Sequence, residues 1–185
     1  MKLTRRLHGT IAATTLAAAL GAPRHLGAQG YPFSQRGSVT QSVAFTDISI
    51  TYGRPVARGR ALWGKLVPWD SVWHPGADSA TRVTFSHDVL LEGQTVKAGR
   101  YTMWLIPHEK GPWKFILSKK FDSFHIPYPG AALDYLRVDV TPEAVSHMET
   151  MAIYFPVVNK DEATLRIHWG ETAVPIHIKA PYKPD

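Results

Sequence analysis

The sequence predicts an all-β protein with little helix, built as an antiparallel β-sandwich that is either jelly-roll-like or a flattened barrel. Roughly ten short runs of β-branched and aromatic residues follow one another at hairpin-like spacing, with turn residues between them. Neither strand–helix–strand alternation nor a helical period is present. The 185 residues are 44% hydrophobic, which is enough apolar material for one core, so we expect a single domain.

The first 28 residues are typical of an export signal. A basic start is followed by an apolar stretch at 11–22 and by small residues near Gly27-Ala28, which offer a cleavage site. We therefore expect a signal peptide over 1–28, an extended linker over 29–37 and one β-sandwich domain over 38–180. The protein would be exported, to the periplasm or as a secreted protein. The choice between general secretion and the twin-arginine route stays open.

Charge and cysteine content exclude several classes of function. Loss of the first 28 residues would remove four of the 21 basic residues and none of the 15 acidic ones, which changes the net charge from +6 to +2. The remaining charges are interspersed, so we expect no nucleic-acid partner. The chain has no cysteine, which excludes disulfides and cysteine zinc sites. The apolar stretch of the signal is too short for a membrane span, so no transmembrane anchor would remain after cleavage.

Two β-branched runs, 39–45 and 48–52, predict the first two strands, with an interruption at Thr46-Asp47. Glycine and proline then break residues 56–76 repeatedly. We expect a long, well-packed connection there, with one helical turn near 61–66. Connections of this length are often functional.

Short runs separated by turn residues predict the middle of the domain. Strands are expected at 81–86, 88–91, 95–98, 101–106 and 113–117. The run 101–106 is apolar on both faces, which is typical of a central strand. Residues 121–132 are rich in aromatic residues, proline and glycine, so we expect an irregular segment.

Alternation of apolar and polar residues predicts three further strands, at 136–140, 151–155 and 165–169. A turn at Gly170 would lead into a last strand at 174–178. Pro175 lacks the N–H that a strand ladder needs, so this last strand is expected at a sheet edge.

Several motifs, taken in order, are similar to those of a known family. They are SITYGRP at 49–55, GR at 59–60, LWGKLVP at 62–68, VWHPGADSAT at 72–81, AGRYT at 98–102 and LRIHW at 165–169. Together they resemble the bacterial exported domain-of-unknown-function family 2911 (DUF2911), over about residues 38–178. The Trp-Gly-x-Leu-Val-Pro and Gly-Ala-x-x-Ala-Thr pieces are the most specific.

The resemblance implies export and a β-rich fold, and it implies no activity and no catalytic residues. Two positions depart from the family pattern, in which Trp73 is followed by Arg and Gly76-Ala77 by Asn. This chain has His74 and Asp78 there. If the family uses the Arg and the Asn to bind a ligand, the chemistry of this member would differ.

The candidate site lies on the connection between residues 54 and 82. Arg54, Trp73, His74 and Asp78 are the candidate ligand-binding residues, because they gather two polar side chains, a guanidinium and a large aromatic ring around one turn. His74 and Asp78 would also be the start of a metal site if His87 or Asp88 joined them. The alternative is that Asp78 caps the turn and His74 is a partly exposed loop residue. We predict no cofactor and no metal.

Three of the six tryptophans, Trp63, Trp69 and Trp73, lie within eleven residues of this connection. They would either pin the connection to the sandwich or line a groove for a sugar ring or an apolar ligand. Pinning is favoured, because a long connection needs apolar anchors to be ordered.

The sequence therefore predicts an exported ligand-binding or structural envelope module whose partner is an unknown small molecule or an envelope component. The alternative from another class is a small secreted or periplasmic hydrolase. It would use His74 with Asp70 or Asp78 and one of Ser71, Ser79 and Ser86, with or without the help of a metal. No Gly-x-Ser-x-Gly motif supports that alternative.

Overall fold

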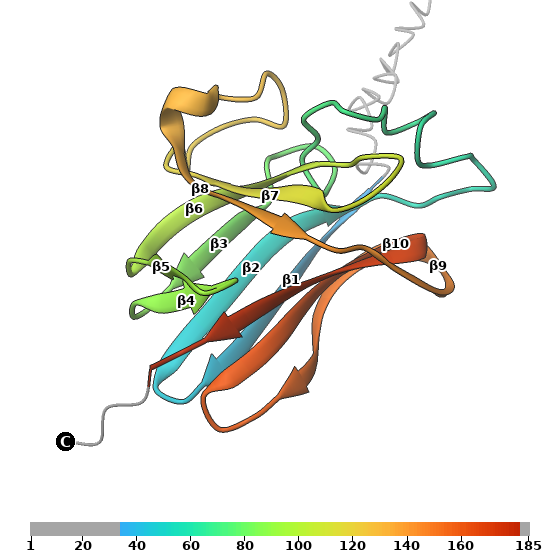
Figure 1. The fold of residues 1–185 in the computed structure, drawn as a ribbon. Coiled ribbons are helices and arrows are strands. Elements are labelled where there is room, and N and C mark those ends of the chain that lie inside the picture. The colour runs from blue at the N-terminus through green and yellow to red at the C-terminus, as the bar shows by residue number, and fades with distance from the viewer. Residues whose placement is uncertain (1–33, 182–185) are drawn as a thin grey trace, which may run out of the picture. The chain divides into compact units, whose positions relative to one another are not determined.

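The computed structural model describes residues 34–181 and has two antiparallel sheets, drawn in Figure 1. The order in the larger sheet is β1-β2-β3-β6-β7-β8, and in the smaller sheet β5-β4-β10-β9. The strands are β1 (Gln35–Val43), β2 (Thr46–Arg54), β3 (Arg82–Phe85), β4 (Val89–Leu91), β5 (Gln94–Val96), β6 (Gly99–Ile106), β7 (Trp113–Ser118), β8 (Asp134–Val140), β9 (Glu143–Val158) and β10 (Glu162–Lys179). The prediction of an all-β antiparallel sandwich is confirmed, and the described sheets form no closed barrel.

One hydrophobic core lies between the sheets, because alternate side chains of facing strands point into it. Ile48 and Ile50 of β2 belong to this core, as do Leu165 and Ile167 of β10. Tyr52 carries its hydroxyl across the gap, where it accepts a 2.8 Å hydrogen bond from the backbone N–H of Ile153. A buried phenol needs such a partner, and this one ties the two sheets together.

The two sheets also meet where the chain leaves β2. The backbone N–H of Met151 in β9 donates to Pro55 O at 2.9 Å, and the N–H of Ala57 donates to Glu149 O at 2.8 Å. The Nε of Arg54 donates to Met151 O at 3.0 Å. These bonds cover part of the outer edge of β9 and fix the start of the long connection.

The first hairpin differs from the prediction. Its turn is at Ala44-Phe45 and not at Thr46-Asp47, because Val43 pairs with Thr46 and Ala44 adopts a positive φ of 50°. β1 starts at Gln35, inside the predicted linker, because Gln35 pairs with Arg54 at the far end of β2. The predicted signal peptide lies outside the described residues.

The last strand agrees with the prediction at its turn and differs in its place in the sheet. β10 folds back near Gly170, where φ is +60°, because Lys179 at its end pairs with Glu162 at its start at 2.9 Å, so the expected turn is confirmed. β10 lies between β4 and β9, so it is not an edge strand. Pro175 is tolerated because the pairing with β9 ends at Ala173 and the pairing with β4 begins at Ile178. The proline falls between two ladders and removes no bond from either.

The long connection contains no helical turn near 61–66. A tight turn closes instead, with the N–H of Val67 donating to Leu62 O and the N–H of Gly64 donating to Val67 O, both at 2.8 Å. Gly64 is required here, because φ is +75° and a Cβ would stand 2.3 Å from Trp69 Nε1. The one described helix is a three-residue 3₁₀ turn, η1 (Ala131–Leu133), and residues 34–181 include no helix of the length and apolarity that a membrane crossing requires.

Candidate functional site

A pocket of about 570 Å³ lies where the connection after β2, the loop before β8 and β10 meet. We call it the His74 pocket. Its lining residues are Ser34, Pro55, Val56, Arg58, Arg60, Leu66, Val67, Val72, Trp73, His74, Gly76, Ala77, Asp78, His125, Ile126 and Trp169. The volume falls within the range of small-molecule sites, and most of the lining is apolar or aromatic.

β6 holds the floor of this pocket in place. The backbone of Trp73 exchanges two 2.8 Å hydrogen bonds with Leu105, beyond the point where β3 ends its own pairing with β6. Thr81 then closes the turn, because its hydroxyl donates to Pro75 O at 2.7 Å. The loop between these two anchors carries His74 into the protein, where only 6% of the residue is exposed.

His74 is a neutral imidazole in this environment. Burial is the main cause that lowers its pKa to about 4, and the neighbouring His125 lowers the pKa further, while a hydrogen bond with the Ser79 backbone acts the other way. Nε2 has no hydrogen-bond partner among residues 34–181. The bond to Ser79 raises the pKa, as it does when the imidazole N–H donates to a backbone carbonyl. Since Nε2 has no partner in the described chain, the donor is Nδ1, and Nε2 is an unprotonated acceptor.

His125 is the neighbour of His74 across the pocket, with the ring centroids 5.4 Å apart. Its Nδ1 donates to the backbone oxygen of Asp78. Asp78 has a positive φ of 65° and an exposed side chain, so it contributes its backbone to the contact with His125. The turn is thereby held by a histidine from a distant segment.

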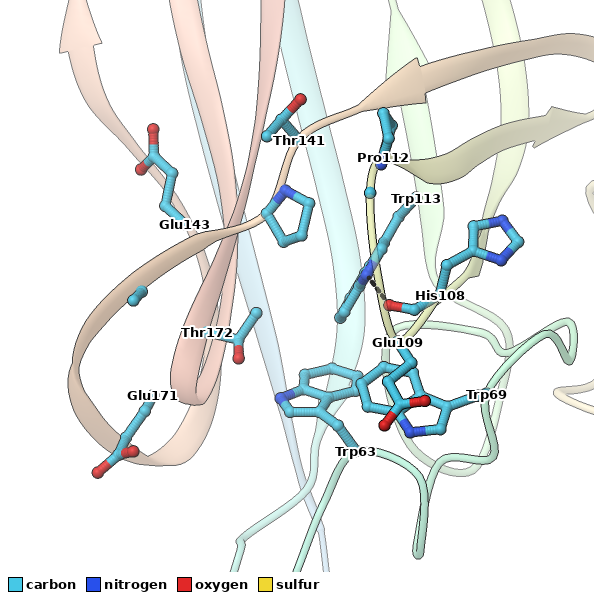
Figure 2. Close-up of a pocket in the computed structure, with 13 residues that line it drawn as sticks. Trp63, Trp69, His108, Glu109, Pro112, Trp113, Thr141, Glu143, Glu171 and Thr172 are labelled. Atoms are coloured by element: carbon cyan, nitrogen blue, oxygen red, sulfur yellow. Dashed lines mark hydrogen bonds between the residues drawn. The ribbon is translucent and has the colours of Figure 1, made fainter.

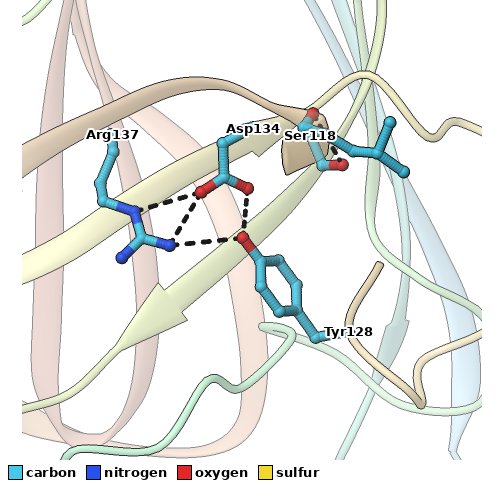
Figure 3. A network of polar contacts seen from close by, with 5 residues as sticks. Ser118, Tyr128, Asp134 and Arg137 are labelled. Atoms are coloured by element: carbon cyan, nitrogen blue, oxygen red, sulfur yellow. Dashed lines mark hydrogen bonds and ion pairs between the residues drawn. The ribbon is translucent and has the colours of Figure 1, made fainter. Parts of the chain in front are cut away.

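A polar network anchors the loop that carries His125 (Figure 3). The hydroxyl of Tyr128 donates to Asp134 Oδ1, and Arg137 Nη2 donates to Asp134 Oδ2 at 2.8 Å. Burial and the bond to Asp134 raise the pKa of Tyr128 to about 12, so the phenol keeps its proton and remains a donor. The network fixes the loop to the start of β8.

Charge and aromatic surface complete the pocket. Arg58 and Arg60 add positive charge to its lining, and the Arg60 guanidinium donates to Val56 O at 2.6 Å. Trp73 and Trp169 stack with a centroid distance of 6.0 Å and an interplanar angle of 12°. Trp169 Nε1 is buried and has no partner within the described chain. Two residues of this lining, Trp169 and His74, thus each hold a buried polar atom that lacks a hydrogen bond.

The structure brings together three of the four candidate ligand-binding residues. Trp73, His74 and Asp78 all line the His74 pocket. Arg54 does not line it, because its Nε is bonded to the backbone of β9. His74 is buried, so the alternative of a partly exposed loop histidine is wrong, whereas Asp78 does occupy a turn with its side chain exposed.

The third ligand considered for a metal site lies elsewhere. His87 and Asp88 follow the end of β3, whereas His74 packs near its start, and Asp88 is paired with Lys97 at 2.8 Å. Within residues 34–181 no group of three or more histidine, aspartate or glutamate side chains is placed to hold a metal ion.

The serines considered for a hydrolase are engaged elsewhere. The Ser79 hydroxyl accepts from Arg36 Nη1 at 2.7 Å, and the Ser71 hydroxyl donates to Trp69 O at 3.3 Å. The Ser86 hydroxyl lies 3.0 Å from His87 Nδ1, outside the candidate connection, and accepts from the backbone N–H of Asp47 at 2.8 Å. A nucleophile needs a base within hydrogen-bond reach, and His74 has no serine hydroxyl as a partner in the described part of the chain.

The tryptophans of the connection pin it to the sandwich and also border cavities, while the ligand-binding role stays a prediction. Trp63, Trp69 and Trp73 are half-buried and pack against the core, so they pin the connection. Each of them also lines a pocket, Trp73 in the His74 pocket and the other two in a separate groove.

His125 and Trp169 are the pocket residues that the sequence did not reveal. His125 lies about 50 positions from His74 in an irregular segment, and no local pattern links the two. Trp169 alternates with Leu165 and Ile167 as a core residue would, and its strand pattern gives no sign that it borders a pocket.

Comparison with known proteins places the chain in a family of proteins. A family model described as a protein of unknown function (DUF2911) matches residues 34–178, which is most of the chain. No curated protein and no solved structure matches it.

Proposed function

Because the chain belongs to the DUF2911 family of proteins of unknown function, its role must be inferred from its own site, and we propose that it is an exported module that binds a small molecule in the His74 pocket. The observation that carries the proposal is the buried Nε2 of His74, a neutral acceptor without a partner in a residue that lines a 570 Å³ pocket. Such a group costs about 1–3 kcal/mol while it stays unpaired. A ligand that donates a hydrogen bond to it removes that cost.

The lining indicates the chemical class of the ligand. Trp73, Trp169 and the aliphatic walls favour an apolar or aromatic body, and Nε2 favours an O–H or N–H donor on it. Arg58 and Arg60 favour a negatively charged group on the same molecule. We therefore infer an amphipathic acid that also carries a hydroxyl or amine donor.

The test uses 4-hydroxybenzoate as the probe and 4-methoxybenzoate, which lacks the donor, as its control. Calorimetric titration at pH 7 should show that hydroxybenzoate binds at least tenfold more tightly, because the methoxy compound leaves Nε2 unpaired. His74→Phe should remove this preference. His87→Phe, at an exposed histidine at the other end of β3, should keep it.

Equal affinity for the two benzoates, or a preference that survives His74→Phe, would contradict the proposal. Lack of binding at about 10 mM, where a millimolar site would be mostly filled, would contradict it as well. Steady hydrolysis of 4-nitrophenyl esters that His74→Phe abolishes would instead support the hydrolase alternative.

A further inference from the structure

A second groove, of about 420 Å³, has lining residues different from those of the His74 pocket and the opposite charge. Figure 2 shows its lining. We call it the Trp groove. Trp63, Trp69 and Trp113 form its aromatic wall, and Glu109, Glu143 and Glu171 supply its carboxylates. Among residues 34–181, its lining includes no lysine and no arginine, whereas the His74 pocket has Arg58 and Arg60.

The carboxylates differ in how they are compensated. Glu143 pairs with Arg166 at 2.6 Å. Glu109 and Glu171 have no ion pair or hydrogen bond within residues 34–181, and they come from different elements, the loop between β6 and β7 and the bend of β10. Two uncompensated negative charges therefore border an apolar, aromatic groove from separate segments. A positively charged ligand would be attracted to this field.

The aromatic wall favours the same kind of ligand. Trp63 meets Trp113 edge to face at 4.8 Å, and Trp69 meets Trp113 edge to face at 6.3 Å, so the ring planes are turned in different directions. Indole faces attract cations through their quadrupole, and quaternary ammonium groups are recognised in this way. Trp113 is held by a 2.9 Å bond from its Nε1 to His108 O, so the wall is fixed before any ligand arrives.

The indole nitrogen of Trp63 in this wall narrows the class of ligand further. Trp63 Nε1 is buried and has no partner in the part of the chain that the structure describes. In Figure 2 this nitrogen lies on the side of the ring toward Glu171 and Thr172. A hydroxyl carried by the cation would accept a hydrogen bond from it.

We propose that the Trp groove is a second binding site, for a small organic cation of the quaternary-ammonium type that also carries a hydroxyl group. It is independent of the proposed function, because the two sites share no lining residue.

Choline is the probe, and 3,3-dimethylbutan-1-ol, which has the same shape without the charge, is its control. Calorimetric titration at low ionic strength, where charges are least screened, should show choline binding at least tenfold more tightly than the alcohol. The double variant Glu109→Gln/Glu171→Gln should weaken choline binding at least tenfold. Trp69→Leu should weaken it too, through loss of the aromatic face.

Two matched variants separate this site from general effects. Asp161→Asn/Glu162→Gln removes the same charge beside Lys179, at the ends of β10 and away from its bend, and should leave choline affinity unchanged. His74→Phe should also leave it unchanged, so failure of the His74 pocket would not affect this result.

The proposal is overturned if choline does not bind at about 50 mM, where a millimolar site would be saturated. It is also overturned if choline and its neutral analogue bind equally or if the Glu109→Gln/Glu171→Gln variant binds choline like the unchanged protein. If glucose bound in the same groove more tightly than choline, the ligand class would be a sugar and the cation proposal would be wrong.

Discussion

At the residue scale, His74 couples the stability of the domain to pH. Its pKa falls from 6.5 to about 4 on folding, so above pH 6.5 it is neutral in both states and does not oppose folding. Below pH 6.5 the unfolded chain takes up a proton that the folded chain refuses, so stability falls with pH until about pH 4. The shift corresponds to a loss on the order of 3 kcal/mol in total, and about 2 kcal/mol by pH 5.

Urea unfolding between pH 7.5 and 5 measures this loss. His74→Asn should show a shallower decline in the free energy of unfolding than the unchanged protein, by about 2 kcal/mol at pH 5. His87→Asn, at an exposed histidine, should follow the unchanged protein. If the free energy of unfolding fell equally steeply with pH in His74→Asn and in the unchanged protein, His74 would take up its proton as readily in the folded chain as in the unfolded one, which would contradict the prediction.

Sequence reasoning found part of this site because the relevant residues are close in the chain. Trp73, His74 and Asp78 surround one proline-glycine turn, and their side-chain chemistry is visible from the sequence. Burial of His74 could not be predicted, because it depends on Trp73 joining β6 and on His125 approaching from a distant loop. The sequence favoured Arg54 as a ligand-binding residue as well, but its guanidinium donates a hydrogen bond to the backbone carbonyl of Met151 in β9.

At the element scale, the loop of residues 119–133 positions His125, and its anchor can be tested. Tyr128→Phe removes the hydroxyl that donates to Asp134, so that Asp134 keeps only Arg137 as a partner. The expected loss is about 1 kcal/mol in the free energy of unfolding, with faster amide exchange in 121–130. Hydrogen-exchange mass spectrometry measures the second effect.

Tyr154→Phe is the matched control for that variant. It removes a hydroxyl that contacts His168 Nδ1 at 3.2 Å on another part of the sandwich. Its exchange in 121–130 should match that of the unchanged protein. Unchanged exchange in Tyr128→Phe would show that the loop is held by other contacts.

The strands show which features of the fold a sequence can predict. The sequence pattern located the strands between residues 82 and 140 closely, because each of these strands buries one or both of its faces and its apolar residues mark the buried face. The turn at Ala44-Phe45 was misplaced, since register depends on the partner strand. Pro175 suggested an edge, but it lies in a gap between two partners that only the three-dimensional arrangement reveals.

At the scale of the whole molecule, export remains a proposal that the N-terminus can test. Mass spectrometry of protein recovered from the producing cells should find a chain that begins near Gln29, after loss of the basic and apolar leader. The recovered chain should be in the periplasmic or extracellular fraction. An intact N-terminus in the cytoplasmic fraction would contradict export.

Two pockets of opposite charge on one sandwich suggest a module that binds small molecules in more than one place. Five tryptophans connect them, because Trp69 contacts Trp113, Trp113 contacts Trp63, and Trp63 contacts the stacked pair of Trp73 and Trp169. Of the three rings that pin the long connection, Trp63 and Trp69 line the Trp groove and Trp73 lines the His74 pocket. Rigid walls of this kind lower the ordering cost of binding.

Histidine ¹⁵N NMR at pH 7 tests the central claim most directly, because it reports the protonation of each imidazole nitrogen. His74 should be neutral with the proton on Nδ1, and its Nε2 resonance should shift toward the hydrogen-bonded range when 4-hydroxybenzoate is added but not when 4-methoxybenzoate is added. A charged His74, or an Nε2 resonance that is unaffected by saturating 4-hydroxybenzoate, would contradict the account.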